Sequence, residues 1–397
     1  MIEMWRYLRK PQLTVYCNLF VFRLLGLAPF SVRTSCLLGI NLRSNDKKIF
    51  SVSKFGYIYN AILTVSMTWL IINSKIYVFP ATIRVEELLP KLVGKSLMVF
   101  GYAMAVIIWI AYILRQSSMV TIANGIYDSF RVMESCRDIH VKHGNCLMFK
   151  WLVFLMSSVY ICVVEHIEYS YTSIIVIYIK LSGLVLGWMM LQYSFILDVF
   201  RDRFADLNEG LLRIGRVSEE FEVPSFFHRK ILINSTVLAD IATLRRVHGE
   251  LCHLCYQVGD NYALLVLLVI IVFSAGSVYN IYFLLIPAIS NYPPLLPLIT
   301  GIGWIVIQLS AVIYLTTSAT RVTQAVRRTA HVIHALLDMC SLHPDVTREL
   351  KIFSREILAK KFHLNIYDIF ILDNSLLSSI AGVKITYLII LIQFLIN

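Results

Sequence analysis

Long apolar stretches alternate with shorter charged ones along this chain, and the apolar stretches determine its predicted architecture. Six of them have the length of a membrane span, and they cover residues 55–79, 96–114, 151–170, 174–197, 262–286 and 295–318. A seventh covers residues 374–397. A helix of about 20 residues, rising about 1.5 Å per residue, crosses a hydrocarbon core of about 30 Å. The pattern therefore predicts an all-α membrane protein with seven transmembrane helices.

The composition agrees with that class, because 58% of the residues are hydrophobic and only 15% are charged. Between Asp260 and Arg321 there are 60 residues without a charged side chain. A proline-rich segment at 287–297 divides this run into the fifth and sixth predicted spans. Such a composition excludes a soluble globular domain.

Lysine and arginine residues gather on one side of the predicted spans. Residues 1–54 carry nine, and the segments 115–150, 199–261 and 319–373 carry five, eight and eight. The opposite side carries four. Because cytoplasmic loops are rich in lysine and arginine, this predicts a cytoplasmic N-terminus and an extracellular C-terminus, inverted relative to a G-protein-coupled receptor. The net charge of +11 thus reflects membrane orientation, and no nucleic-acid partner is expected.

The N-terminal segment, residues 1–54, is expected to lie in the cytoplasm. Its apolar stretch at 13–30 is interrupted by Arg23 and closed by Pro29, and basic residues flank it on both sides. The cytoplasmic leaflet is negatively charged and attracts such residues. These features predict an interfacial helix that lies on membrane lipid and leads into the first span.

Two further segments are expected to extend the helices into the cytoplasm. In the loop 199–261, apolar positions recur every three or four residues on both sides of Pro224. The segment 319–373 begins in the same way. We therefore expect a six-helix transmembrane bundle over 55–318, with the loop 199–261 as a helical extension, and a cytoplasmic anchor region at 319–373.

The seventh stretch carries polar residues at a regular spacing. Thr386-Tyr387 is followed by five apolar residues and then by Gln393-Phe394. At 3.6 residues per turn, one helix face holds Thr386, Ile390, Gln393 and Asn397, while the adjacent face holds Tyr387 and Phe394. A glutamine inside a membrane span is costly unless it finds a partner or water. The stripe therefore indicates either an aqueous path or a hydrogen bond between helices.

This spacing resembles the Thr-Tyr, five apolar residues, Gln-Phe motif that closes insect gustatory receptors, within the insect odorant and gustatory receptor superfamily. All four fixed positions match, and they lie at the end of the last predicted helix. The resemblance implies a ligand-gated cation channel in the plasma membrane of chemosensory neurons. It also implies a homotetramer, or a heteromer with related subunits, whose last helices (374–397) surround the pore.

The resemblance implies roles for single residues as well. Gln393 would lie at the gate, and Phe394 and Tyr387 would couple the gate to the ligand region. Rings of Ile390 and Gln393 would close the pore by dewetting and offer partial ligands to an ion, with Thr386 and Asn397 on the same face. Residues 374–397 contain no acidic side chain, so a poorly selective cation pore is expected. Lys384 lies on the opposite face and should point away from the axis.

The ligand is expected to bind among the helices, because the predicted outer loops are short. A pocket in the six-helix bundle would be formed by aromatic and polar residues of the outer halves: Tyr102, His166, Tyr279, Asn280, Tyr282, Trp304 and Gln308. Interfacial aromatic belts are the alternative interpretation for the tyrosines. Sugar-receptor members tend to carry a glutamate where this chain has Leu388, which favours a bitter tastant over a sugar.

Three other classes of function are alternatives to a channel. A metabotropic seven-span receptor requires the opposite orientation, and a secondary transporter would use Glu165, Lys180 and Lys384. No nucleophile–base pair or phosphate loop indicates an enzyme, and no cofactor is expected. The pair Cys252-x-x-Cys255 has a metal-like spacing, but His331-x-x-His334, which would complete it, follows about 75 residues later, so no metal is expected. The expected partners are a small tastant, permeating cations and membrane lipid.

Overall fold

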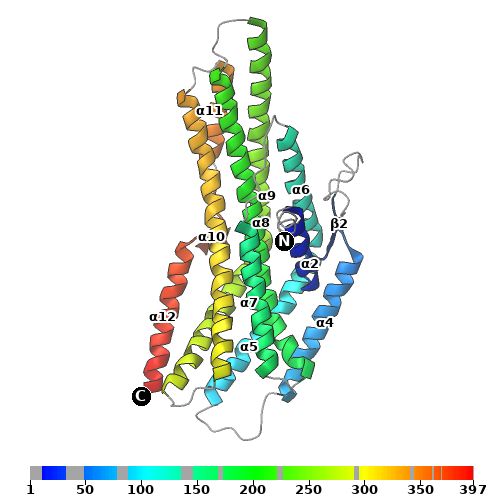
Figure 1. Ribbon diagram of the computed structural model, residues 1–397, viewed down its shortest axis with the longest axis vertical. Coiled ribbons are helices and arrows are strands. Elements are labelled where there is room, and N and C mark those ends of the chain that lie inside the picture. The colour runs from blue at the N-terminus through cyan, green and yellow to red at the C-terminus, as the bar shows by residue number, and fades with distance from the viewer. Residues whose placement is uncertain are drawn as a thin grey trace, which may run out of the picture.

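The computed structural model describes residues 11–32, 49–77, 88–135, 146–168, 173–220, 227–289, 295–339, 344–359, 362–367 and 369–396. Helices dominate these ranges (Figure 1): α2 (Pro11–Leu24), α4 (Lys54–Tyr77), α5 (Leu88–Leu114), α6 (Gln116–Ser135), α7 (Cys146–Glu168), α8 (Ser173–Glu220), α9 (Phe227–Ile289), α10 (Leu295–Met339), α11 (Pro344–Ala359) and α12 (Ser375–Ile396). The described residues also form two short antiparallel strand pairs. Strand β1 (Phe30–Val32) pairs with β2 (Phe50–Val52), and β3 (Asn365–Ile366) pairs with β4 (Phe370–Ile371). The prediction of a mainly helical protein is confirmed.

Each of the seven predicted spans falls on a helix, namely α4, α5, α7, α8, α9, α10 and α12. Among the described residues, five helices contain a stretch long and apolar enough to cross a membrane: α5, α8, α9, α10 and α12. Helix α7 contains a shorter apolar stretch, Lys150–Val164. The chain is therefore a helical protein with five candidate membrane spans, while the count of seven and the inverted orientation stay predictions.

Three helices continue far beyond their apolar parts. Helices α8, α9 and α10 have 48, 63 and 45 residues, which correspond to about 70, 95 and 70 Å and exceed the membrane core at least twofold. Figure 1 shows that the extended ends gather with α11 at one end of the molecule. Helix α11 buries Val346, Leu350 and Phe353 there. Helices α8, α9 and α10 thus continue beyond the fourth, fifth and sixth predicted spans, while the cytoplasmic position of these extensions stays a prediction.

Helix α8 lies at the centre of the bundle and packs on α5, α7, α9 and α10. Its residues from Leu184 to Leu191 are all buried. The Trp188 ring makes edge-to-face contacts with Phe154 of α7 and Phe22 of α2, at centroid distances of 5.2 and 6.1 Å. Helix α8 therefore connects the N-terminal helix α2 with the surrounding helices α5, α7, α9 and α10.

The N-terminal segment differs from the predicted interfacial helix at 13–30. Helix α2 ends at Leu24, and the chain turns at Gly26, whose φ is +76°. The residues after the turn, Leu27 and Ala28, are fully buried in the core. Hydrophobicity places such a segment equally well on lipid or inside the protein, so the sequence alone did not distinguish the two.

Side chains from four helices bind the backbone of this N-terminal turn, residues 24–29. The donors and the carbonyls that accept are Tyr59 to Leu24 (2.6 Å), Trp109 to Leu25 (2.9 Å), Asn60 to Gly26 (2.8 Å), Gln192 to Leu27 (2.8 Å) and Gln116 to Pro29. Buried carbonyls without a partner are costly. These donors from α4, α5, α6 and α8 thus explain how a stretch of irregular backbone is stable inside the bundle.

Candidate functional site

The predicted ligand-binding residues lie on four helices. Tyr102 is on α5, His166 on α7, Tyr279, Asn280 and Tyr282 on α9, and Trp304 and Gln308 on α10. Tyr102 and Gln308 are buried, whereas Trp304 and the three α9 residues are half-buried. The side chain of His166 lies outside the described residues.

Three of these residues pack against glycines of neighbouring helices. A Cβ atom on Gly183 of α8 would lie 2.7 Å from Trp304 Cζ3, and one on Gly276 of α9 would lie 2.9 Å from Gln308 Nε2. A Cβ atom on Gly94 of α5 would overlap the Tyr279 ring. The absence of a side chain at each glycine therefore allows close contact across the pairs α8–α10, α9–α10 and α5–α9.

Two of the predicted ligand contacts carry polar atoms without a partner. Tyr102 Oη and Gln308 Oε1 are buried and accept or donate no hydrogen bond within the described part of the chain. Leaving such an atom unpaired costs roughly 1–3 kcal/mol. A polar group supplied from outside the chain would remove that cost, so both atoms mark positions where a ligand or water gains affinity.

Helix α12 carries the predicted pore residues and lies at the edge of the molecule, beside α9 and α10 (Figure 1). Its half-buried residues follow one helical stripe on the side facing the bundle: Leu377, Ile380, Lys384, Leu388, Leu391 and Ile392. Thr386, Tyr387, Ile390 and Gln393 are exposed. The stripe with Gln393 thus faces away from the bundle. The Phe394 side chain and Asn397 lie outside the described residues.

A hydrogen bond connects the start of α12 to α10. The Asn374 backbone N–H donates to Thr320 Oγ1 of α10 at 3.1 Å. The Asp373 carboxylate accepts from the Ser375 backbone N–H at 2.9 Å, which caps the helix. Leu372 and Leu376 are buried next to this cap. Helix α12 is therefore anchored at its first turn, and beyond it only the half-buried stripe contacts the bundle while the other positions are exposed.

A buried ion pair that the sequence analysis missed lies between α7, α8 and α10. The Lys150 ammonium donates to Asp198 Oδ2 and to Ser318 Oγ, both at 2.8 Å. Only 9% of the Lys150 side chain and 2% of the Asp198 side chain are exposed. Ser318 Oγ is also 2.8 Å from Ser194 Oγ. In the sequence, Lys150 is the last residue of the predicted loop 115–150 and directly precedes an apolar stretch, which gives no sign of a buried partner.

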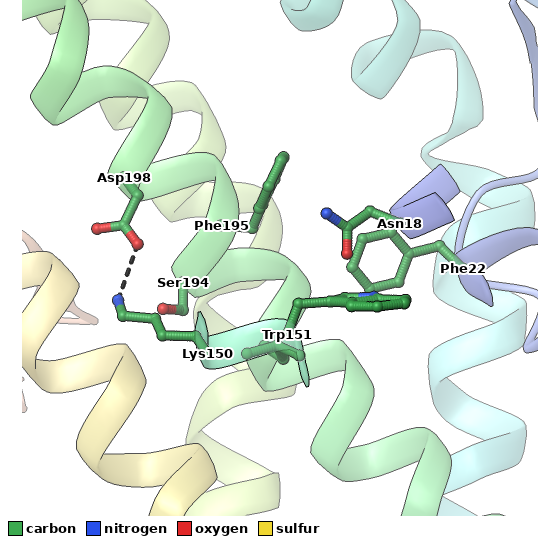
Figure 2. A pocket seen from close by; sticks show the side chains of 8 residues that line it. Asn18, Phe22, Lys150, Trp151, Ser194, Phe195 and Asp198 are labelled. Carbon is green, nitrogen blue, oxygen red and sulfur yellow. Dashed lines mark hydrogen bonds and ion pairs between the residues drawn. The ribbon is translucent and has the colours of Figure 1, made fainter. Parts of the chain in front are cut away.

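Next to this pair lies a small cavity with room for about one water molecule. Its polar lining comes from three helices: Asn18 of α2, Lys150 and Trp151 of α7, and Ser194 and Asp198 of α8. Figure 2 shows Asn18 and Phe22 on one side of the cavity, with Lys150 and Asp198 on the other. None of the predicted site residues lines it.

Of the residues considered as a metal site, Cys255 is buried and Cys252 half-buried beside the buried His248, whereas His331 and His334 are exposed. The His248 ring contacts the Phe204 and Phe353 rings edge-on, at 5.5 and 5.4 Å. Burial raises the pKa of the Cys255 thiol, which disfavours the thiolate that binds metals. No cluster of three or more potential ligands occurs among the residues that the structure describes.

Several long apolar helices packed around a central helix, with a few polar residues among their apolar ones, define a multi-pass membrane protein. A family model described as 7tm chemosensory receptor matches residues 15–397. The chain belongs to that family, the insect gustatory and odorant receptor superfamily. It is therefore a chemoreceptor, and the resemblance found in its last helix is confirmed at the family level. No curated protein matches the chain.

Proposed function

We propose that this chemoreceptor is a subunit of a ligand-gated, poorly selective cation channel, and that α12 lines its pore. The observation that carries the proposal is the division of α12 into two faces. One face packs on α9 and α10 and includes Lys384, whereas the opposite face presents Ile390 and Gln393 away from the bundle. A glutamine that faced lipid at this depth would be costly. If Gln393 instead faces water and the Gln393 side chains of the other subunits, that cost is removed.

The proposed assembly is a homotetramer, or a heteromer with related subunits, in the plasma membrane of chemosensory neurons. Four α12 helices around an axis would stack a ring of Ile390 on a ring of Gln393, a hydrophobic gate beside partial ion ligands. Thr386 and Asn397 belong to the same stripe, and Tyr387 and Phe394 lie beside it. Lys384 would remain outside the pore, so its charge would not repel cations there.

The proposed ligand is a small tastant, bitter rather than sugar, that binds between α5, α9 and α10. Support comes from the unpaired buried atoms Tyr102 Oη and Gln308 Oε1, with Trp304 and Tyr279 packed nearby on the glycine contacts described above. A ligand shifts the equilibrium only by binding the open state more tightly than the closed state. Gln308→Leu should therefore raise the half-maximal ligand concentration about tenfold, the equivalent of about 1.4 kcal/mol.

Helix α10 offers a physical link between the two proposed regions. It carries Trp304 and Gln308 in its first half, and Thr320, which binds the start of α12, three turns later. A shift of α10 on ligand binding would therefore move the anchored end of α12.

Whole-cell current in cells expressing this chain tests the pore assignment. Under a panel of bitter compounds and sugars, Gln393→Ala should change the relative permeability or the block of the evoked current. The matched control is Leu391→Ala, two residues away on the face that packs against the bundle. An evoked current whose selectivity and block are identical in wild type and Gln393→Ala would refute the assignment.

The orientation of the chain in the membrane distinguishes the proposed channel from a metabotropic receptor. A tag at the N-terminus should be accessible only in permeabilised cells, and a tag at the C-terminus should be accessible in intact cells. The converse result would support the metabotropic alternative. Substrate flux without single-channel steps would instead support a secondary transporter.

A further inference from the structure

Helix α2 has an exposed apolar side as well as a buried one. Asn18 and Phe22 are buried against the bundle, at 2% and 3% exposure. On the opposite side of the helix, 68% of Phe20 and 59% of Leu24 are exposed. The exposed Arg23 lies on that side too. The described part of the chain therefore covers α2 on one side only.

Hydrogen bonds join this exposed side to the first strand pair and to the start of α4. The Tyr59 hydroxyl of α4 donates to the Leu24 carbonyl at 2.6 Å, and Arg23 Nη2 donates to the Phe30 carbonyl of β1 at 3.1 Å. Phe30 is paired with Val52 of β2, which is 57% exposed. The exposed residues of these segments form one surface, called here the N-terminal corner: Phe20, Arg23, Leu24, Val52, Lys54 and Phe55.

The N-terminal corner combines large apolar side chains with positive charge. Each of its four apolar side chains is more than half exposed, and its arginine and lysine are exposed beside them. The segments 11–32 and 49–77, which form the corner, contain no aspartate or glutamate. Water would solvate the two charges but not the four apolar side chains. The interface of a membrane suits both, because acyl chains lie there next to charged headgroups.

The position of the corner along the molecule agrees with a membrane interface. Figure 1 shows α2 and the start of α4 at the level at which α12 begins. The stretch Ser375–Gln393 of α12 is a candidate membrane span. The extended ends of α8, α9 and α10 lie beyond this level, together with α11. From the corner, α4 continues in the direction of the spans with an exposed apolar stripe: Ile58, Ile62, Val65, Trp69 and Ile72.

We propose that the N-terminal corner binds anionic phospholipid. Its apolar side chains contact the acyl chains next to the headgroups, while Arg23 and Lys54 bind the negatively charged groups of the headgroup. The Arg23 guanidinium has five N–H donors, so the bond to the Phe30 carbonyl leaves others for a phosphate. A zwitterionic lipid would leave the two positive charges without a net counter-charge. Lipid binding at this corner requires only a chain that spans a membrane, and it does not depend on channel activity.

The test is photocrosslinking of the full chain in nanodiscs made of equal parts phosphatidylcholine and phosphatidylserine. A benzophenone amino acid replaces Phe20, and mass spectrometry counts the adducts with each lipid. We expect phosphatidylserine adducts to exceed phosphatidylcholine adducts at least about fivefold, because one basic residue near an anionic surface contributes about that factor. The double variant Arg23→Gln, Lys54→Gln should bring the ratio close to one. The matched control has the benzophenone at Trp69, which is 61% exposed further along α4; it should label both lipids equally.

Three results would overturn the proposal. Equal lipid ratios at Phe20 and Trp69 would show that the corner contacts lipid without selecting an anionic headgroup. A crosslink from Phe20 to a second protein chain would show that another subunit covers the corner. Lipid adducts at Trp69 but none at Phe20 would show that the corner faces water.

Discussion

Removing the Asp198 carboxylate should destabilise the protein more than most other single substitutions. In Asp198→Ala the Lys150 ammonium stays buried without its counter-ion. At a separation of 2.8 Å and an effective dielectric constant of about 20, the lost attraction is about 6 kcal/mol. The contacts of the ammonium with Ser318 Oγ (2.8 Å) and the Tyr314 ring (5.7 Å) are present in both forms and do not change the difference. Because the variant no longer desolvates the Asp198 carboxylate, the expected loss of stability is smaller than the lost attraction, about 3–5 kcal/mol, as for other broken buried pairs.

The assay is thermal unfolding of the purified protein in nanodiscs, followed by tryptophan fluorescence. Glu250→Gln is the matched control, because it removes a carboxylate from an exposed pair with Arg246 (3.9 Å; 66% and 51% of the two side chains exposed). Such pairs contribute at most about 0.5 kcal/mol. The double variant Lys150→Met, Asp198→Leu should recover most of the stability, because apolar replacement of a whole buried pair is often neutral. Equal effects of Asp198→Ala and Glu250→Gln would show that water reaches the pair and that the reasoning is wrong.

Three further substitutions test other parts of the structure. Gly26→Ala should cost at least about 1–2 kcal/mol of stability in the same melting assay, because φ is +76° and a Cβ atom would lie 2.7 Å from the nearest side-chain oxygen; an unchanged melting temperature would contradict the buried turn. Gly183→Ala should displace Trp304 and raise the half-maximal agonist concentration about tenfold or more, whereas an unchanged dose–response curve would remove Trp304 from the ligand site. Lys384→Met should leave the reversal potential of the evoked current unchanged, because Lys384 is on the packed face of α12; a changed cation permeability would place it in the pore.

The helices were predictable because their signal is local. Apolar runs of membrane-spanning length located seven helices, and the three- and four-residue spacing in 199–261 indicated that α8 and α9 continue beyond the apolar part. The 3.6-residue period also placed Lys384 opposite Gln393, and the structure has the two on opposite faces of α12. These inferences use only neighbours along the chain. They fail where the partner of a residue is far away in sequence.

The N-terminal turn shows this limit. Its carbonyls are bound by Trp109, Gln116 and Gln192, which follow it by more than 80 residues. The sequence does not indicate the partners of these side chains, since Trp is common at membrane interfaces and Gln forms hydrogen bonds between helices in many contexts. The hydropathy of 13–30 therefore identified an apolar segment, but it did not show that Leu27 and Ala28 are buried in the bundle while Phe20 and Leu24 are exposed.

The Lys150–Asp198 ion pair could not be predicted from the sequence for a different reason. Both residues lie where an apolar stretch meets a charged one, the position at which lysine and aspartate are usually solvated. Their separation of 48 residues gives no helical period that would relate them. A usable signal nevertheless exists: Ser194 lies one turn before Asp198, and Ser318 lies beside Ser194 on α10, at the end of the sixth apolar stretch. Polar residues that recur at the boundary of several spans are therefore better interpreted as candidates for mutual pairing before they are counted as loop charges.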